Sequence, residues 1–381
     1  MKTSAVLEAS VVLHDAQFPD HRAGDRVVDL LARKLEESVR VLVQTTVAEA
    51  DDRAEFGAGL LATPARTSPK FFYDEQGSAL FTAICELDEY YPTRIEAAIF
   101  DERRAAVAGA LPPHSQWIDL GCGDGAKARG WLEPAHVRRY IGVDIAESWL
   151  RASLAALAGE RASGAEARVP ARDPARSHDS ALDIVGVVTD FTRTFDLHTL
   201  LAEEPCMPPV FFYPGSSIGN FTHDEARAFL ASVREHIECH ASGGGKLLIG
   251  VDLVKDRDVL RAAYDDALGV TAAFNRNVLR VANRLLGADF DPAAFEHRAV
   301  FDEDASRIEM QLVSIRAQTV RIGSHARRFA DGEVIVTEYS HKYTIEGFGA
   351  LLAASGFATG ERLHRWSDER GWFGVFVAEP A

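Results

Sequence analysis

The sequence is short of cysteine, methionine and positive charge. Its 381 residues include 4 cysteines and 3 methionines, and 57 acidic residues against 41 basic ones give a net charge of −16. Because nucleic-acid phosphates require a basic surface, this balance argues against a nucleic-acid partner. Cys85, Cys122, Cys206 and Cys239 form no CxxC pair. We therefore expect no metal site and no disulfide framework, but buried free thiols in a reducing compartment.

Long apolar runs are also missing. No stretch approaches the ~20 apolar residues that a membrane-spanning helix needs. The segment MKTSAVLEASVVLHDAQ carries Glu8 and His14 early, which is untypical of a secretory signal. With 47% hydrophobic and 26% charged residues, the composition is that of an ordinary globular protein. We expect a cytoplasmic monomer with no membrane partner.

The first hundred residues predict helices. Apolar residues recur at helical spacing in 25–44, and the turn-rich segment 63–78 leads into a further helix. Pro92 either ends that helix or begins the next one. In the next helix, Thr93 is a candidate N-cap with Glu96 three residues on, the spacing of a capping box.

Strands alternate with helices in the middle of the chain, from QWIDL to GGKLLIGVDLV. This alternation predicts a parallel, doubly wound sheet. The segment 157–181 is rich in Ala, Arg, Gly and Pro, and we expect an exposed, mobile insertion there. After residue 252 the pattern changes to two helices, several strands, and a final helix and strand.

A glycine-rich loop, DLGCGDG, follows the first strand of this alternating region. Gly121, Gly123 and Gly125 allow a sharp turn and a close approach to a ligand. Their spacing is not the GxGxxG of the dinucleotide fingerprint, which disfavours NAD. A glycine turn at this point also serves S-adenosylmethionine (SAM), although a plain strand-to-helix turn would look the same.

Polar residues end the next three strands. Asp144 can accept both ribose hydroxyls of either SAM or NAD, and Asp190 can bind an adenine amino group. The loop FFYPGSSIGNF carries Ser216 and Asn220 after the fourth strand. Because ligands bind at the carboxyl ends of strands in such sheets, we interpret these as site residues, while a glycine-flanked turn remains the alternative for the loop.

Six segments together resemble a known family. They are YDEQGSALF…ELDEYYPTR, DLGCGDGAKAR, PGSSIGNFT, AYDDALGVTAAFNRNVL, SRIEMQL and TEYSHKYT. In this order they resemble the SAM-dependent histidine Nα-methyltransferases of ergothioneine biosynthesis. The N-terminal extension and the 157–181 segment depart from the family pattern. The resemblance implies that SAM donates methyl groups to the α-amino nitrogen of L-histidine, a small-molecule substrate, to give hercynine.

The resemblance implies an α/β fold. A Rossmann-like SAM-dependent methyltransferase domain, with a doubly wound and mostly parallel sheet, would be joined to a second α+β substrate-binding domain. In the implied organisation, residues 1–58 are an N-terminal extension with a helix, and 59–105 are a segment of the substrate domain. The methyltransferase domain is 106–255, with the insertion 157–181. The substrate-binding domain is 256–345, and 346–381 form a C-terminal helix and strand that return to the methyltransferase domain.

Single residues take roles from the same resemblance. Tyr90 and Asn220 are implied to hold the amino end of the substrate and are also the catalytic candidates. Tyr73 and Tyr264 are implied to bind its carboxylate, and Glu338 and Ser340 its imidazole. Met310 and Thr271 are implied to line the imidazole pocket, and Gly215 completes the set. The residues implied to hold SAM are Gly121, Gly123, Lys127, Asp144, Asp190 and Phe191.

The chemistry suits these residue types at the amino end. Methyl transfer needs a desolvated, well-aimed neutral amine rather than a protein nucleophile. Asn220 and a tyrosine hydroxyl can orient an amine, whereas a carboxylate there would favour the ammonium form, so we expect no strong base. The methylated products are cationic, and the aromatic faces of Phe81, Tyr90 and Phe274 can hold cations.

At the imidazole end, Glu338 and Ser340 lie two residues apart on one strand and share a face. His341 then points to the opposite face, where we expect a packed or surface histidine. Whether Tyr90 or Tyr91 faces the substrate cannot be decided from adjacent positions, and the resemblance favours Tyr90. Alternatives are methylation of a related amino acid such as tryptophan, a SAM-binding regulatory protein without turnover, and an NAD oxidoreductase.

Overall fold

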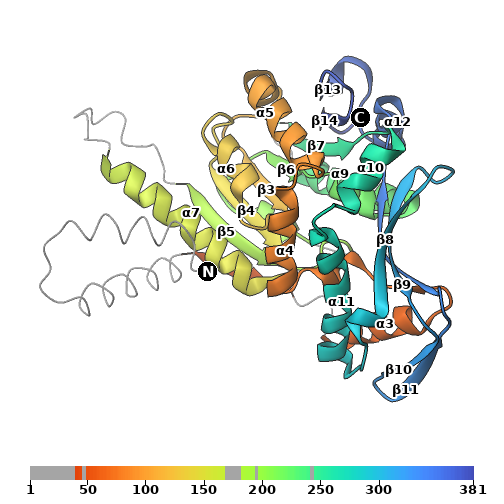
Figure 1. Cartoon of the computed structure of the whole chain (residues 1–381). Coiled ribbons are helices and arrows are strands. Elements are labelled where there is room, and N and C mark those ends of the chain that lie inside the picture. The colour runs from red at the N-terminus through yellow and green to blue at the C-terminus, as the bar shows by residue number, and fades with distance from the viewer. Residues whose placement is uncertain (1–38, 45–48, 168–181, 194–195, 241–243) are drawn as a thin grey trace, which may run out of the picture. The chain divides into compact units, whose positions relative to one another are not determined.

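The computed structural model describes residues 39–44, 49–167, 182–193, 196–240 and 244–381 (Figure 1). They form two compact units, one from the described part of Met1–Gln44 and Pro113–Phe195, the other from that of Thr45–Pro112 and Asp196–Ala381. No helix in these ranges has the length and apolar character needed to cross a bilayer.

The first unit is built on parallel strands. Their order is β1 (Arg40–Val43), β5 (Asp183–Val188), β4 (Arg139–Asp144) and β3 (Gln116–Leu120), and all neighbours are parallel. Helix α6 (Ala126–Leu132) follows β3, and α7 (Glu147–Ala167) follows β4 and packs on β4 and β5 (Figure 1). Because the strands are parallel, the carboxyl ends of β3, β4 and β5 lie at one edge.

Strand β1 corrects the helix expected over 25–44. Arg40–Val43 is a strand whose Val41 lies opposite Gly186 of β5, while 25–38 lie outside the described residues. The segment RVLV is rich in β-branched residues, and pairing with β5 satisfies its backbone groups. Tertiary pairing thus outweighs the helical periodicity here.

The expected insertion 157–181 begins inside a helix. Helix α7 continues to Ala167, and Leu157 is 4% exposed, so the expectation of an exposed loop is wrong at its start. The remainder, 168–181, lies outside the described residues.

The second unit contains a sheet with strand order β6 (Pro209–Tyr213), β7 (Lys246–Asp252), β14 (Phe373–Ala378) and β13 (His364–Ser367). The β6–β7 pair is parallel and the other two are antiparallel. Its helices are α5 (Tyr91–Gly109), α8 (His198–Leu201), α9 (His223–His240) and α12 (Ile345–Ala354), and short turns are η3 (Ser217–Asn220) and η5 (Gly360–Arg362). Strands and helices alternate from β3 to β7 as predicted, and the Rossmann-like α/β class is confirmed.

A second sheet in this unit has the order β2 (Ala65–Arg66), β12 (Val334–His341), β9 (Arg307–Ser314) and β8 (Phe295–Asp302). Beside it are the ribbon β10 (Gln318–Ile322) and β11 (His325–Phe329), helices α3 (Glu49–Leu61), α4 (Glu75–Cys85), α10 (Arg257–Tyr264) and α11 (Val270–Leu286), and the turns η1 (Pro69–Phe72) and η4 (Pro292–Ala294). Helix α11 packs against α4, β8 and β9 around one apolar core (Figure 1).

The start of α5 differs from the predicted capping box. The helix begins at Tyr91, so Pro92 begins the next helix and Thr93 lies inside it. Glu96 is 1% exposed and accepts a hydrogen bond from the Gly215 N–H at 2.7 Å. Its carboxylate therefore holds a distant loop instead of capping its own helix.

All four cysteines are free, as predicted. Cys122 is buried and Cys85 is half-buried, but Cys206 and Cys239 are exposed. The expectation of burial is therefore wrong for these two.

Candidate active site

A cavity in the second unit gathers residues from distant parts of the chain. All nine residues implied to hold the substrate line it. The full lining is Tyr73, Phe81, Ile84, Tyr90, Gly215, Ser216, Ser217, Asn220, Ala263, Tyr264, Thr271, Phe274, Met310, Glu338 and Ser340.

The segment YDEQG fixes the position of Tyr73 through its neighbours. Asp74 caps α4 by accepting from the Gly77 N–H at 2.8 Å, and it also accepts from Asn277 and Arg284 of α11, each at 2.8 Å. A Cβ on Gly77 would lie 1.7 Å from the Phe72 carbonyl oxygen, so only glycine fits. Asp74 thus ties the segment to α11, and Gly77 allows the start of α4 to pack closely against Phe72.

Aromatic rings form one wall of the cavity. Phe81 contacts Tyr73, Phe274 and Tyr90, with ring centroids 5.6, 6.0 and 6.2 Å apart. Tyr90 also meets Tyr264 edge to face at 6.2 Å. These rings bring together the three aromatic residues that the sequence suggested for holding a cation.

Tyr90 and Tyr91 occupy different environments. Tyr90 lines the cavity, and within the described residues its hydroxyl has no protein partner. The Tyr91 hydroxyl instead donates to the Asp252 carboxylate, 2.8 Å from Oδ2, and accepts from Lys255 at 2.7 Å. The structure therefore leaves the Tyr90 hydroxyl for a ligand.

Substituting the two tyrosines separately tests this division. We expect Tyr91→Phe to lower the free energy of unfolding by about 1–2 kcal/mol, because a buried hydrogen bond is lost, with histidine affinity within about twofold. Tyr90→Phe should leave stability unchanged and weaken histidine binding about tenfold. Urea unfolding and calorimetric titration measure the two effects. The opposite pattern would assign the binding role to Tyr91.

The loop after β6 places Asn220 on the cavity wall. Ser216 has a positive φ of 59°, and its Oγ accepts from the Asp252 N–H at 2.8 Å. A Cβ on Gly219 would lie 2.8 Å from the His341 carbonyl oxygen, so this loop and β12 touch through glycine. The Gly215 N–H is already bonded to Glu96, so Gly215 can offer a ligand only its carbonyl.

Strand β12 carries Glu338 and Ser340 to the cavity. The β12–β9 pairing shifts register between Val336 and Glu338, after which Glu338 lies opposite Met310. A β-bulge re-aims the side chains that follow it. No side-chain partner of the Glu338 carboxylate lies among the described residues, and burial raises its pKa to about 7 against a weaker, lowering effect of Lys342.

His341 is a packed histidine, as predicted. It is 3% exposed, its Nδ1 lies 3.1 Å from the Gly219 carbonyl oxygen, and its ring meets that of His223 at 5.0 Å. Burial lowers its pKa, so the ring is held neutral against the loop.

A buried charged network beneath the cavity was not anticipated. Lys342 is bonded to the Tyr264 hydroxyl at 2.9 Å, to Ser340 Oγ at 2.8 Å and to Asp252 Oδ2 at 2.9 Å. Lys255 also pairs with Asp252. A signal for Lys342 existed in the sequence, because it continues the two-residue spacing of Glu338 and Ser340.

In the first unit, the glycine loop and the end of β4 hold each other. Gly121 and Gly123 have φ of 69° and 54°, and Asp144 accepts from the N–H groups of Gly123 at 3.1 Å and Ala146 at 3.0 Å. Burial raises the Asp144 pKa, and these bonds oppose the rise. A Cβ on Gly123 would meet no atom within 4 Å, which leaves open space beside the loop.

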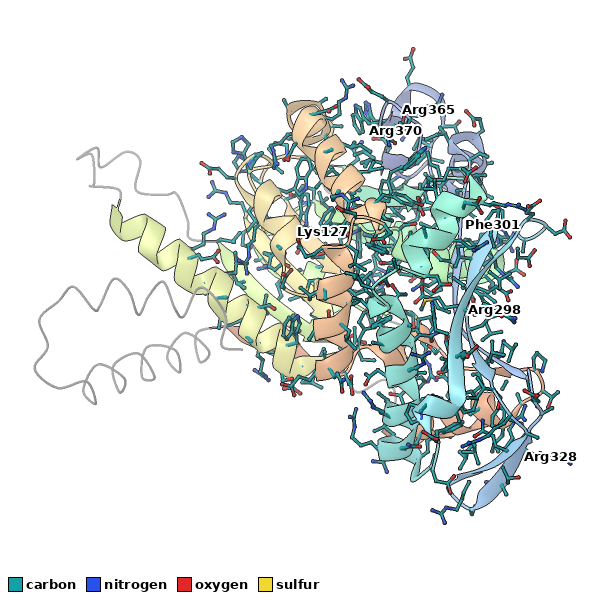
Figure 2. All side chains as sticks on the ribbon, in the orientation of Figure 1. Lys127, Arg298, Phe301, Arg328, Arg365 and Arg370 are labelled. Atoms are coloured by element: carbon teal, nitrogen blue, oxygen red, sulfur yellow. The ribbon has the colours of Figure 1, made fainter. Side chains whose placement is uncertain are left out.

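The other residues implied to hold SAM lie in the same unit. Asp190 follows β5, is 9% exposed and accepts from the Thr192 N–H at 3.1 Å. The Phe191 ring lies 3.6 Å from where a Cβ on Gly121 would be. Lys127 is exposed on α6 (Figure 2). Five of the six therefore lie in the glycine loop or at the carboxyl ends of β4 and β5, while Lys127 is an exposed residue of α6.

Asp119 lies in β3, directly before the glycine loop, and sequence reasoning missed its environment. It is 2% exposed and accepts from the Tyr140 hydroxyl at 2.8 Å. Burial raises its pKa to about 7, with the Tyr140 bond acting in the opposite direction. This bond joins the side chains of β3 and β4 just before the loop begins.

One cluster in the second unit has ligand atoms at metal-binding separations. Asp196, His198 and His236 offer atoms within 4.8 Å of one another. Both His236 nitrogens are already engaged, with Nε2 accepting from the Leu197 N–H at 3.2 Å and Nδ1 at 2.8 Å from the Ser232 carbonyl oxygen. Both ring nitrogens of His236 are therefore already used within the protein.

Comparison with known proteins gives concordant results. The model of a family described as histidine-specific, SAM-dependent methyltransferases matches residues 52–380. A histidine N-alpha-methyltransferase of Mycolicibacterium smegmatis is 38% identical over 332 residues, which cover 86% of this chain and 94% of that protein. Its counterpart in Mycobacterium tuberculosis is 38% identical over 333 residues with the same coverage. Ergothioneine biosynthesis protein 1 of Schizosaccharomyces pombe is 27% identical over 279 residues, 71% of this chain and 33% of that protein.

Proposed function

The chain belongs to the family of histidine-specific, SAM-dependent methyltransferases, and we propose that it trimethylates the α-amino group of L-histidine to hercynine, the first step of ergothioneine biosynthesis. The observation that carries the proposal is the cavity, where all nine residues implied for histidine meet. The expected monomeric state and cytoplasmic location stay predictions.

The residues around the glycine loop fit the adenosine part of SAM. SAM supplies an electrophilic methyl group when it is bound. Two carboxylates, Asp144 and Asp190, follow neighbouring parallel strands, and open space lies beside Gly123. Carboxylates at such strand ends suit ribose hydroxyls and an adenine amino group. We assign these roles to Asp144 and Asp190, and loop contacts to Gly121, Gly123 and Phe191. Lys127 is exposed, so we assign it a contact at the edge of the SAM site.

The amino end of histidine is assigned to Asn220 and Tyr90. Within the described residues, neither the Asn220 amide nor the Tyr90 hydroxyl has a hydrogen-bond partner, and both line the cavity. Burial raises the Tyr90 pKa well above its usual value, so the hydroxyl stays neutral. Two neutral groups can orient an amine without stabilising its ammonium form. That preserves the lone pair that attacks the methyl carbon.

The carboxylate and imidazole ends are assigned to neighbouring groups of the cavity wall, because the Tyr264 and Ser340 oxygens lie 2.7 Å apart. Tyr73 and Tyr264 would donate to the carboxylate, and Glu338 would accept from the imidazole N–H, with Ser340 beside it. Met310 and Thr271, each 2% exposed, would fill the space around the ring. A polar partner at the ring rejects side chains that cannot use it, because a buried group is then left unpaired.

The product carries a quaternary ammonium, which the aromatic wall suits. The faces of Phe81, Tyr90 and Phe274 can each contribute about 0.5–2 kcal/mol to a nearby cation. This favours the successively methylated intermediates as well as the trimethylated product. The cavity can therefore hold the substrate through three transfers.

Incubation with SAM and each of the twenty amino acids, read by mass spectrometry, tests the function. We expect histidine alone to gain three methyl groups. Methylation of tryptophan in place of histidine would support a re-tooled pocket, and no methylation of any amino acid would contradict the enzyme. A Glu338→Ala variant run in parallel excludes a contaminating activity.

A further inference from the structure

We propose that Lys342 is a positioning residue that selects for the carboxylate of the substrate, by orienting and polarising the Tyr264 and Ser340 hydroxyls from beneath the cavity. The inference rests on the proposed function and deepens it. Lys342 does not line the cavity itself; Tyr264 and Ser340 do.

The geometry uses every donor of the Lys342 ammonium. Its three N–H groups have three acceptors, Asp252 Oδ2 at 2.9 Å, the Tyr264 hydroxyl at 2.9 Å and Ser340 Oγ at 2.8 Å. The Lys342 side chain is 0% exposed and that of Asp252 is 1% exposed. Such a group has no water to exchange with, so its orientation is set by these partners.

The two hydroxyls are also bonded to each other, with 2.7 Å between the Tyr264 and Ser340 oxygens. Each oxygen accepts from Lys342, and one of the two hydroxyl hydrogens is used in the bond between them. One hydrogen remains, and we place it toward the cavity, because the ammonium occupies another side of both oxygens and both residues line the cavity. The pair therefore presents a single donor, which suits an anionic or lone-pair acceptor.

Charge acts in the same direction. The network holds two ammonium groups, Lys342 and Lys255, around one carboxylate, Asp252, and the Glu338 carboxylate on the cavity wall also interacts with the Lys342 charge. Burial works against the charged form of Lys342, but the charge and hydrogen bonds of Asp252 and Tyr264 together outweigh it and raise the pKa of the lysine, so the ammonium persists. Burial raises the pKa of Tyr264, and Lys342 opposes that rise without cancelling it, so the hydroxyl stays neutral and keeps its hydrogen. A carboxylate ligand thus meets a neutral donor whose oxygen is bonded to a buried ammonium.

The test compares L-histidine with L-histidinamide, which lacks the carboxylate charge, by calorimetric titration of the full chain at pH 7.5. We expect Lys342→Met to weaken histidine binding about 10- to 30-fold, since a charge-assisted contact is lost, and histidinamide binding less than about threefold. Tyr91→Phe is the matched control, because it alters the far side of Asp252 and keeps both ammonium groups. In Tyr91→Phe, the ratio of histidine affinity to histidinamide affinity should equal the ratio in the wild type.

Equal weakening of both ligands, or of neither, would overturn the proposal and leave Lys342 a purely structural residue. Failure of the wild type to bind histidine would instead contradict the proposed function. Removing one member of a buried pair can prevent folding. If Lys342→Met does not fold, the Asp252→Asn/Lys342→Met double variant removes both charges of the pair and is compared with Asp252→Asn alone. The added loss of Lys342 must then again weaken histidine binding more than histidinamide binding.

Discussion

Glu338→Ala should lower the affinity for L-histidine at least about 100-fold while the affinity for SAM changes less than about twofold. The carboxylate lines the cavity without a protein hydrogen-bond partner among the described residues, so a bound imidazole N–H would be its first. Losing the acceptor leaves that N–H buried and unpaired, which is the costly case. Calorimetric titration with each ligand measures both affinities. Equal loss of the two would contradict the assignment of Glu338 to the imidazole.

Glu338→Gln separates the charge of this side chain from its shape. Burial raises the Glu338 pKa to about 7, so the carboxylate is mostly protonated below that pH and ionised above it. The imidazole of histidine also titrates, but it does so equally with both proteins. The ratio of wild-type to Glu338→Gln affinity should therefore rise roughly tenfold per pH unit up to that pKa and then level off. A ratio that does not vary with pH would show that the ionised form is not the acceptor.

The sequence predicted the members of the substrate cavity better than it predicted local structure. Tyr73, Asn220, Tyr264 and Glu338 come from distant segments, and only the resemblance of whole motifs brought them together in advance. Local rules failed where tertiary contacts outweigh them. Glu96 has the spacing of a capping box, yet it bonds the Gly215 N–H of another loop. Nothing within its own helix could have indicated that partner.

The buried network around Asp252 shows why the other residues of the site could not be predicted from the sequence. Asp252 ends a strand that reads as plain core, and its partners Tyr91 and Lys342 lie 161 and 90 positions away in the chain. Spacing on β12 could have placed Lys342 on the face of Glu338 and Ser340. It could not have supplied the carboxylate beneath, because a pairing of this kind depends on the packing of three separate segments.

The glycine loop and the acids near it were predicted from a general rule and did not need the resemblance. Its glycines and the acids Asp144 and Asp190 follow from the rule for strand ends, and the structure places them around β3, β4 and β5. Asp119 was overlooked because an acid before a glycine loop looks like part of the turn. In the structure it is 2% exposed and bonded to Tyr140 of β4, so it belongs to the interior of the sheet and not to the turn.

Asn220→Asp should reduce kcat about 100-fold and leave histidine bound. The substitution keeps the size and position of the side chain on the cavity wall, but it adds a carboxylate where we assign the α-amino group. An opposite charge within ~4–6 Å raises the pKa of an amine by about 1–3 units, so the neutral, reactive form becomes about 10- to 1000-fold rarer. Because the ammonium is stabilised, histidine affinity should hold or rise. The loss therefore appears in kcat rather than in KM.

The pH profile distinguishes this cause from a displaced substrate. If the carboxylate acts by holding the proton, the activity of Asn220→Asp should recover as pH rises, with its midpoint about 1–3 units above that of the wild type. Asn220→Ser, a neutral polar control, should lose activity without moving the midpoint, because it weakens orientation and leaves the amine pKa alone. An unshifted profile for Asn220→Asp would place Asn220 away from the reacting nitrogen. Since no described carboxylate other than Glu338 lines the cavity, the wild-type amine has no such competitor at its own end.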